Sequence, residues 1–294
     1  MNIWITGFNL SIDTVVMIEK SDKYRRLHAK QWKSAGSKGA NVFRSLLHLG
    51  VIPHLIGVTW GITGEYIKSI LKRLCPNPMH LHILHLRHQE SRINIIEIDE
   101  NGEKLISANS PEISPDTFSK FIKSISKQIQ PDDVLILTGS FPHNMTLKDL
   151  FPLLQNFAPQ NIWIDLKGKH LIDAYHYIPT GIFKINHIEK EDFTEKNIMP
   201  ENLIVTSSTR VVAKLGEKHI VVNIPQVQVI NTIGAGDVFM ASMIYEKILA
   251  KKSWTEALKI SSARATASTQ TLGVSIWHEE IANQLLSSIT VFHY

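Results

Sequence analysis

A turn of small residues, Asn231-Thr-Ile-Gly-Ala-Gly-Asp237, runs directly into the apolar, helix-forming segment Val238–Tyr245. Such a turn leaves backbone N–H groups unpaired at a helix N-terminus, which favours a phosphate or a developing oxyanion. Gly234 and Gly236 carry no side chain, so an anion can approach the backbone closely. Asp237 is predicted to be a general base that takes a proton from a hydroxyl as it attacks phosphorus. The alternative is that Asp237 caps the helix, and these seven residues alone do not decide between the two.

Further polar residues lie next to predicted strands and helices. Asn41 ends the small-residue segment Ala35-Gly-Ser-Lys-Gly-Ala-Asn41, and its amide in the first turn of a helix can bind a sugar hydroxyl. Asp13 follows the first strand and is either a turn residue or a ligand for sugar hydroxyls. Asn186 and Glu189 share a helix face and can hold a hydrated Mg²⁺, although local pattern favours a helix-capping pair.

The composition indicates a globular protein with an anionic substrate. The chain has 294 residues, 44% hydrophobic and 20% charged, enough for one large α/β domain with a small appendage. The net charge of +4 suits an anion, and because Lys and Arg are scattered we expect no nucleic-acid partner. One cysteine excludes a disulfide framework and thiolate metal sites. No leader peptide or membrane span is expected, which predicts a cytoplasmic protein without a membrane partner.

Strand-like and helical segments alternate along the chain. The expected strands are Ile3–Gly7, His54–Val58, Val134–Leu137, Ile162–Asp165, Ile182–Ile185 and Leu203–Thr206, and the expected helices are Ala40–Leu49, Glu65–Leu74, Pro115–Gln130, Leu147–Phe157, Val238–Lys251 and Trp254–Leu272. This alternation predicts an α/β fold with a mainly parallel central sheet and helices on both faces. Ligands of such sheets bind at the carboxyl ends of the strands.

Two segments, Thr14–Lys33 and His82–Ala108, contain extended runs without helices between them. Within the second, Arg92–Glu97 and Lys104–Ala108 flank Asp-Glu-Asn-Gly, a good hairpin turn. We expect the two segments to form a small antiparallel sheet that serves as a lid over the site. The open edges of that sheet allow a homodimer through the lid. No nucleophile motif, P-loop or dinucleotide-binding motif is present in the sequence.

Together these motifs resemble the ribokinase (PfkB) family of carbohydrate kinases. Asn231–Asp237 is similar to the C-terminal signature of that family, and Gly36–Val42 to its N-terminal Gly-Gly-x-Gly-x-Asn signature. Asn186–Glu189 resembles its Asn-x-x-Glu magnesium motif, and Thr138–Pro142 its Ser-Gly-Ser-Leu-Pro segment. The matches run the whole length of the chain, which implies one ribokinase-like domain over residues 1–294.

The resemblance implies ATP as co-substrate, Mg²⁺ as cofactor, and a role for each matched residue. Asp237, Gly234, Ala235 and Gly236 would form the catalytic turn. The expected acceptor-binding residues are Asp13, Gly36, Ser37, Lys38, Asn41, Arg92, Ser140 and Arg26. The expected nucleotide-binding residues are Lys184, Thr206, Ser208, Thr232, Gly234 and Gly236, and Asn186 and Glu189 would bind Mg²⁺ through water.

Within the family, Asn9–Asp13 and Ser91–Ile95 resemble the phosphofructokinase and tagatose-6-phosphate kinase branch. The arginine of the second segment, here Arg92, meets the sugar phosphate in that branch, and a planar guanidinium suits this role. We therefore expect phosphorylation of a hydroxymethyl group of a sugar phosphate. The alternatives are a kinase of an unphosphorylated sugar or nucleoside, and a catalytically weak sugar-binding regulatory protein of the same fold.

Two positions depart from the family pattern. Ser37 stands where the family has its second glycine, and its side chain would crowd the sugar. Ser207–Arg210 contains no glycine where the family has Leu-Gly-x-x-Gly close to the nucleotide. The sequence therefore leaves the phosphoryl donor, the identity of the sugar and the oligomeric state open.

Overall fold

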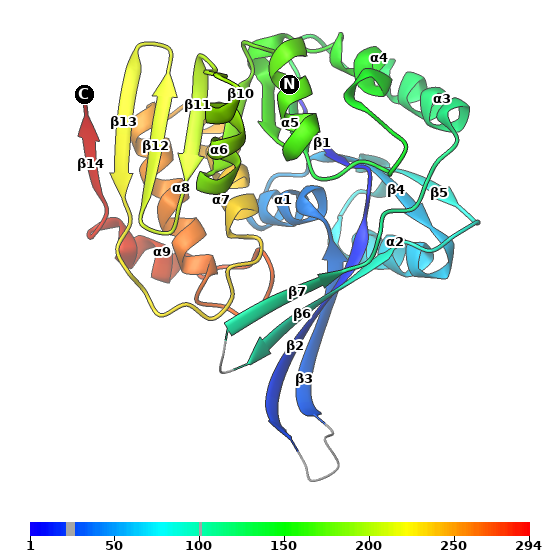
Figure 1. Cartoon of the computed structure of the whole chain (residues 1–294), viewed down its shortest axis with the longest axis horizontal. Helices are drawn as coiled ribbons and strands as arrows, with labels where there is room; N and C mark the ends of the chain where they lie inside the picture. Colours follow the sequence, from blue (N-terminus) through cyan, green and yellow to red (C-terminus); the bar gives the residue numbers. More distant parts are fainter. Residues whose placement is uncertain (22–26, 100–101) are drawn as a thin grey trace.

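A large sheet runs through the computed structural model, which describes residues 1–21, 27–99 and 102–294 (Figure 1). Within these ranges ten strands pair in the order β14-β13-β12-β11-β10-β9-β8-β1-β4-β5. Their bounds are β1 Ile3–Gly7, β4 His54–Trp60, β5 Leu81–Leu86, β8 Val134–Thr138, β9 Ile162–Asp165, β10 Ile182–Asn186, β11 Asn202–Thr206, β12 Arg210–Leu215, β13 Lys218–Asn223 and β14 Thr290–His293. Neighbouring strands from β11 to β5 are parallel, whereas β11 to β14 pair antiparallel. The predicted mainly parallel sheet is confirmed.

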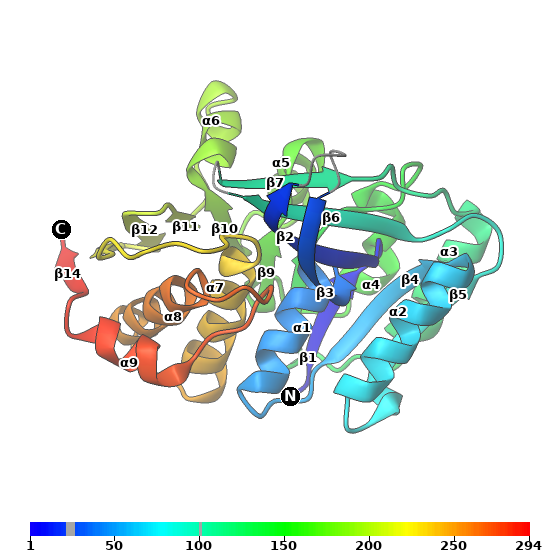
Figure 2. The same cartoon turned by 90° about the horizontal axis from the view of Figure 1, so that it is seen from below.

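Helices cover both faces of this sheet (Figure 2). Along β1 the side chains alternate, so that Ile3 and Ile5 enter one hydrophobic cluster and Trp4 enters the other. The first cluster is completed by α1 Lys38–His48, α2 Gly61–Leu74, α7 Ala235–Met243, α8 Trp254–Ser268 and α9 Glu279–Leu286, and the second by α3 Pro115–Ser126, α4 Phe151–Leu154, α5 Gly168–Tyr177 and α6 His187–Glu195. None of the helices in the described ranges is long and apolar enough to cross a membrane.

Two predicted helices differ from the observed ones in kind as well as in their bounds, whereas the other predicted helices differ only at their ends, by up to four residues. The expected helix 147–157 divides into a 3₁₀ turn, Leu147–Leu150, and the short α4. Pro152 explains the break, because it has no N–H to continue the helix and is tolerated only in the first turn. The expected helix 238–251 begins earlier, at Ala235, and continues as a π-helix over Ile244–Leu249.

A second sheet of four strands projects from the main body, in the order β3-β2-β6-β7 (Figure 1). Its strands are β2 Ser11–Ser21, β3 Leu27–Gly36, β6 Arg92–Asp99 and β7 Gly102–Ser107. The expectation of a purely antiparallel sheet is wrong, because the two hairpins meet through the parallel pair β2 and β6. The expected second segment, 82–108, also starts too early. Its first part lies in β5, which follows the crossover helix α2 and pairs parallel to β4 in the main sheet.

Candidate active site

A cavity of about 1190 Å³ lies between the carboxyl ends of the central strands, the small sheet and helices α7 and α8. It is the place expected for a ligand site in a parallel α/β sheet. Most of the predicted site residues line it: Asp13, Ser37, Lys38, Asn41, Arg92, Ser140, Lys184, Asn186, Thr206, Ser208, Thr232, Gly234, Ala235, Gly236 and Asp237. Gly36 and Glu189 lie behind that lining, against Asp13 and Asn186 respectively. Arg26, predicted to assist at the sugar, lies outside the described residues.

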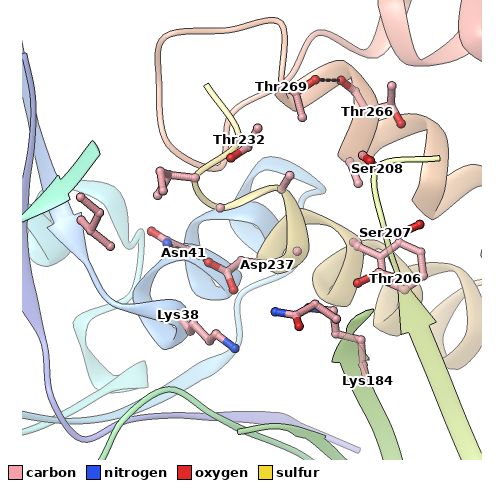
Figure 3. Close-up of a pocket in the computed structure, with 18 of the residues that line it drawn as sticks. Lys38, Asn41, Lys184, Thr206, Ser207, Ser208, Thr232, Asp237, Thr266 and Thr269 are labelled. Carbon is pink, nitrogen blue, oxygen red and sulfur yellow. Dashed lines mark hydrogen bonds between the residues drawn. The ribbon is translucent and has the colours of Figure 1, made fainter. Parts of the chain in front are cut away.

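Asp237 lies in the first turn of α7, buried at the floor of the cavity. The N-terminal cap of this helix is Gly234, with a φ of 87°, so Asp237 is not the capping residue. One carboxylate oxygen of Asp237 accepts a hydrogen bond of 2.8 Å from the Asn41 amide, and the two side chains face each other in Figure 3. Burial, together with the nearby charge of Asp165, raises the pKa of Asp237 to about 7. That value suits a general base at neutral pH.

Asp165, at the end of β9, is a fully buried carboxylate that holds two of the predicted lysines. Lys184 Nζ lies 3.1 Å from one of its oxygens, and Lys38 Nζ contacts the other. Burial alone would favour the neutral acid, but the two ammonium groups hold the pKa of Asp165 below its ordinary value. A side chain at position 236 would lie 2.7 Å from Lys184 Nζ, which explains the glycine there.

Asp165 is not among the predicted site residues, although it lies at the carboxyl end of a buried strand, where ligands of parallel sheets bind. Two polar residues of the small sheet, Asn94 on β6 and Ser107 on β7, also line the cavity and were not predicted. Asn94 donates a hydrogen bond of 2.7 Å to Asp13, and Ser107 donates one of 2.7 Å to Asn94. That Asn94 and Ser107 lie opposite each other depends on the register of the β6–β7 hairpin, which the sequence did not reveal.

The end of the cavity at the small sheet combines a carboxylate with a guanidinium. Asp13 is buried against Gly36, where any side chain would overlap its carboxylate, and burial raises the pKa of Asp13. Arg92 donates to the carbonyl of Asn9 at 3.3 Å through one terminal nitrogen, while its buried Nε has no hydrogen-bond partner among the residues that the structure describes. A buried donor without an acceptor is costly, so Arg92 is prepared for an anion in the cavity.

Ser37 is held in a backbone conformation that normally requires glycine, with φ of 98° and ψ of 156°. It caps α1, since its hydroxyl accepts a hydrogen bond of 3.3 Å from the N–H of Ala40. Its side chain also lines the cavity. A non-glycine residue in this region of φ and ψ costs about 1–3 kcal/mol, and such strain is concentrated at functional sites.

Asn186 and Glu189 form the helix-capping pair, and one oxygen of the Glu189 carboxylate takes no part in the cap. Asn186 Oδ1 accepts from the Glu189 N–H at 2.8 Å, and Glu189 Oε2 accepts from the Asn186 N–H at 2.9 Å. The other Glu189 oxygen, Oε1, is buried and has no hydrogen-bond partner among the described residues, and it forms a long ion pair of 3.9 Å with Lys167 Nζ. An orphaned carboxylate oxygen fits a hydrated Mg²⁺. In the described parts of the chain no three His, Cys, Asp or Glu residues form a metal cluster, so most ligands would be water or substrate.

The opposite end of the cavity lies between the end of β11 and helix α8 (Figure 3). Thr206, Ser207 and Ser208 approach from the strand, and Thr266 and Thr269 from the helix. Between them the lining is apolar and includes Val211, Ile224, Val229, Phe239 and Ala265. An apolar lining beside an anion-binding turn suits a nucleobase with its phosphates on the turn.

The sequence as a whole identifies the family to which this site belongs. A profile of the pfkB family of carbohydrate kinases matches residues 8–280. The chain belongs to this family. It is therefore a carbohydrate kinase, and the signatures at both ends of this pfkB kinase meet at the contact between Asn41 and Asp237.

Curated relatives of this pfkB kinase cover almost its whole length. The 1-phosphofructokinase of Bacillus subtilis is 26% identical over 313 residues, which span 98% of this chain and 99% of the relative. The D-tagatose-1-phosphate kinase of Bacillus licheniformis is 26% identical over 310 residues, 96% of this chain and 98% of the relative. Phosphofructokinase-2 of Escherichia coli, in complex with substrates and products, superimposes with a TM-score of 0.81 at 20% identity, covering 98% and 99% of the two chains. That likeness confirms the ribokinase-like fold.

Proposed function

We propose that this kinase transfers the terminal phosphoryl group of ATP to a hydroxymethyl group of a ketohexose phosphate. The observation that carries the proposal is Arg92, which lines the same cavity as Asp237 and whose guanidinium has a buried Nε without a hydrogen-bond partner among the described residues. The positive charge of Arg92, at the end of the cavity near the small sheet, suits a phosphate group that is already on the acceptor sugar. Because relatives include a 1-phosphofructokinase and a D-tagatose-1-phosphate kinase, we place that phosphate on carbon 1.

In the proposed reaction the acceptor hydroxyl attacks the terminal phosphorus of ATP. The new bond joins the acceptor oxygen to phosphorus, the bond to the bridging oxygen of ADP breaks, and the hydroxyl proton passes to Asp237. Asn41 orients the Asp237 carboxylate through its hydrogen bond. Lys38 and Lys184, held by Asp165, bring two positive charges to the phosphates. Glycines at 234 and 236 and the small Ala235 let the donor approach the α7 N-terminus, where backbone N–H groups and the helix dipole favour the transferring phosphoryl group.

Mg²⁺ fits this site through Glu189 and Asn186. Glu189 Oε1, which accepts no hydrogen bond within the described residues, would accept hydrogen bonds from the water shell of the cation, and Asn186 lines the cavity. When bound, the cation neutralises charge on the donor phosphates. We further propose a cytoplasmic location, where ATP and sugar phosphates are both available.

Two alternatives make different demands on the same cavity. A kinase of a free sugar or nucleoside would leave the Nε of Arg92 without an anion. A regulatory protein without turnover would not need a base of pKa about 7 at the floor of the cavity, so Asp237 argues against it. Thr206, Ser208 and Thr232 line the nucleotide end despite the missing glycine of Ser207–Arg210, which supports retained nucleotide binding.

A screen of acceptors tests the proposal. Purified protein would be assayed with ATP and Mg²⁺ against fructose and tagatose, each as the free sugar, the 1-phosphate and the 6-phosphate. We expect the highest kcat/KM with a 1-phosphate. Preference for a free sugar would overturn the phosphosugar proposal, and absence of turnover with all six, together with intact ligand binding, would favour the regulatory alternative.

The outer face of the small sheet supports the proposed homodimer. Ile93, Ile95 and Ile106 are 48%, 39% and 56% exposed, and Ile62 and Tyr66 of α2 continue the apolar surface. Contiguous exposed apolar surface of this kind marks a protein interface. Light scattering at micromolar concentration should give twice the monomer mass, and Ile95→Lys should return it to the monomer mass. A wild-type protein that is monomeric at all micromolar concentrations tested would exclude the dimer.

A further inference from the structure

The small sheet contacts the catalytic turn through one acidic side chain. Glu103, at the start of β7, accepts a hydrogen bond of 2.7 Å from the backbone N–H of Thr232 and contacts the Thr232 hydroxyl with its other oxygen. The two residues are 129 positions apart in the sequence. In Figure 1 the β6–β7 hairpin extends towards the yellow segment that leads into α7. Thr232 belongs to the turn that is proposed to receive the donor phosphates.

The same hairpin carries the side chains that line the proposed acceptor end of the cavity. Asn94 on β6 pairs in register with Ser107 on β7, and Glu103 pairs with Ile98 near the other end of the two strands. Polar contacts therefore lie at both ends of one hydrogen-bonded ribbon. Asn94 and Ser107 lie at the acceptor, and Glu103 lies at the donor turn.

Apolar packing strengthens the connection between hairpin and turn. Ile96 and Ile98 of β6 form a small buried cluster with Val274, against which Ile233 packs. Ile233 directly follows Thr232 in the catalytic turn. A displacement of the hairpin must therefore disturb both the buried cluster and the Glu103 hydrogen bond, because packed groups do not deform continuously.

We propose that Glu103 is a positioning residue that couples acceptor binding to donor binding. An acceptor held by Asn94 and Ser107 fixes the hairpin, and the fixed hairpin holds Thr232 through Glu103 in the conformation that receives the nucleotide. The acceptor should then raise the affinity for the nucleotide, and by linkage the nucleotide should raise the affinity for the acceptor by the same factor. This inference rests on the proposed function, since it assumes that both ligands bind in this cavity.

Calorimetric titration with a non-hydrolysable ATP analogue, with and without saturating fructose 1-phosphate or tagatose 1-phosphate, tests the coupling. In the wild type the acceptor should lower the Kd of the analogue at least about fivefold. In Glu103→Ala this factor should fall to within about twofold of unity, while the Kd of the analogue alone changes little. Glu103→Gln keeps an oxygen that accepts the Thr232 N–H, so it should retain most of the coupling.

The neighbouring position provides a matched control. Lys104 points to the opposite face of β7, where its side chain is largely exposed and lies 3.9 Å from Glu97. Lys104→Ala removes a lid charge without touching the turn, and it should keep the wild-type coupling factor. An equal coupling factor in the wild type and Glu103→Ala, with both ligands bound, overturns the inference alone. A wild type that binds the nucleotide but no ketohexose phosphate overturns the proposed function and the inference with it.

Discussion

The side-chain amide of Asn41 donates a hydrogen bond of 2.8 Å to the carboxylate of Asp237, across 196 positions of sequence. Asn41 lies in the first turn of α1 and Asp237 in the first turn of α7, and the two helices pack side by side. The hydrogen bond fixes one carboxylate oxygen, which favours presentation of the other to a hydroxyl in the cavity. The two glycine-rich signatures thus form a single unit, in which the first orients the carboxylate of the second, which we propose as the base.

Replacement of the base should abolish most of the activity. Asp237→Asn is nearly isosteric, so folding and ligand binding should survive while proton transfer is lost. The expected loss is about 10²–10⁴ in kcat, the usual contribution of a positioned general base. Steady-state kinetics and calorimetric binding on the same preparation check this, and a variant that keeps more than about half of the wild-type kcat would exclude Asp237 as the base.

The raised pKa of Asp237 predicts a pH profile for the wild-type enzyme. Burial raises this pKa to about 7 in the free protein, and only the carboxylate can accept a proton. We therefore expect kcat/KM to rise about tenfold per pH unit below 7 and to level off above it. A profile of kcat/KM that is flat between pH 5.5 and 8 would contradict the assignment.

The same group should affect folding stability with the opposite trend. The folded pKa of Asp237 lies above its unfolded value near 3.8, so the native state binds more protons between about pH 4 and 7. Its contribution to stability is complete at low pH and is lost as the pH rises towards 7. The Asp237→Asn variant has no ionisable group at this position, so it does not lose stability in this way as the pH rises. Its melting temperature should therefore exceed that of the wild type by an amount that grows from pH 5 to 8.

Histidine protonation must be separated from this effect. Burial, and the neighbouring His80 and His82, lower the pKa of His54 to about 4, so protonation of His54 destabilises the fold as the pH falls from about 6.5. This effect is common to wild type and Asp237→Asn, and it cancels in the difference between their melting temperatures. A difference that is constant over this range would mean that Asp237 is already ionised at pH 5.

Glu189→Gln tests the proposed magnesium site. The substitution keeps an oxygen for the Asn186 N–H but removes the charge next to the free position, where a hydrated cation would lie. We expect the Mg²⁺ concentration for half-maximal rate to rise about 10–100-fold, as is typical for outer-shell partners of a metal. Melting temperatures of the two proteins provide the control. An unchanged Mg²⁺ titration with full activity would leave the pair as a helix cap only.

Local sequence patterns predicted the strands and helices that have a clear apolar pattern and a glycine at their end. The parallel strands are continuous apolar runs, and α1 ends next to Gly50, so both were predicted. Strands β12 and β13 were missed although their buried residues alternate, at Val211, Ala213 and Leu215 in the first strand and at Ile220 and Val222 in the second. Strand β14 was missed because it has only four residues and none of them is buried. Helix α5 was missed as well, since it begins at Gly168 without a capping side chain.

Site residues that belong to a sequence motif were predicted. Site residues that come together only in the tertiary structure were missed. Asp237, Asn41 and Lys38 lie in glycine-rich segments whose chemistry is local. Asp165 and Ser107 were missed because their significance depends on neighbours brought by other strands, Lys184 for the first and Asn94 for the second. Such pairs depend on which strands lie side by side in the sheets, and the order of the strands along the sequence does not determine that.

Ser37 predicts an unusual stabilising mutation. Glycine adopts φ of 98° without strain, so Ser37→Gly should release part of the roughly 1–3 kcal/mol stored there. Loss of the cap and the extra freedom of glycine in the unfolded chain offset some of this gain. We expect the melting temperature to rise by about 2–4 °C. Ser37→Ala keeps the strain and loses the 3.3 Å cap, so it should lower the melting temperature, and a rise in both variants would contradict the strain argument.

Arg92→Ala separates the phosphosugar kinase from a kinase of free sugars. The Arg92 side chain is largely removed from water, and its buried Nε has no hydrogen-bond partner in the described part of the chain, so a phosphate in the cavity would form a charge-assisted contact. Such a contact contributes about 1.5–3 kcal/mol, or roughly tenfold to a hundredfold in binding. The KM for the preferred sugar phosphate should rise by that factor, and the KM for ATP should stay within about twofold. Arg92→Lys restores the charge without the planar fork and should recover only part of the loss.

The corresponding free sugar provides the internal control for Arg92. Without a phosphate it has nothing for the guanidinium to bind, so its kcat/KM should be the same in wild type and Arg92→Ala. The ratio of kcat/KM for phosphosugar over free sugar should therefore fall by the full factor in the variant. Equal losses for both acceptors, or an equal loss for ATP, would show that Arg92 supports the cavity through its 3.3 Å hydrogen bond to the Asn9 carbonyl and does not bind a phosphate.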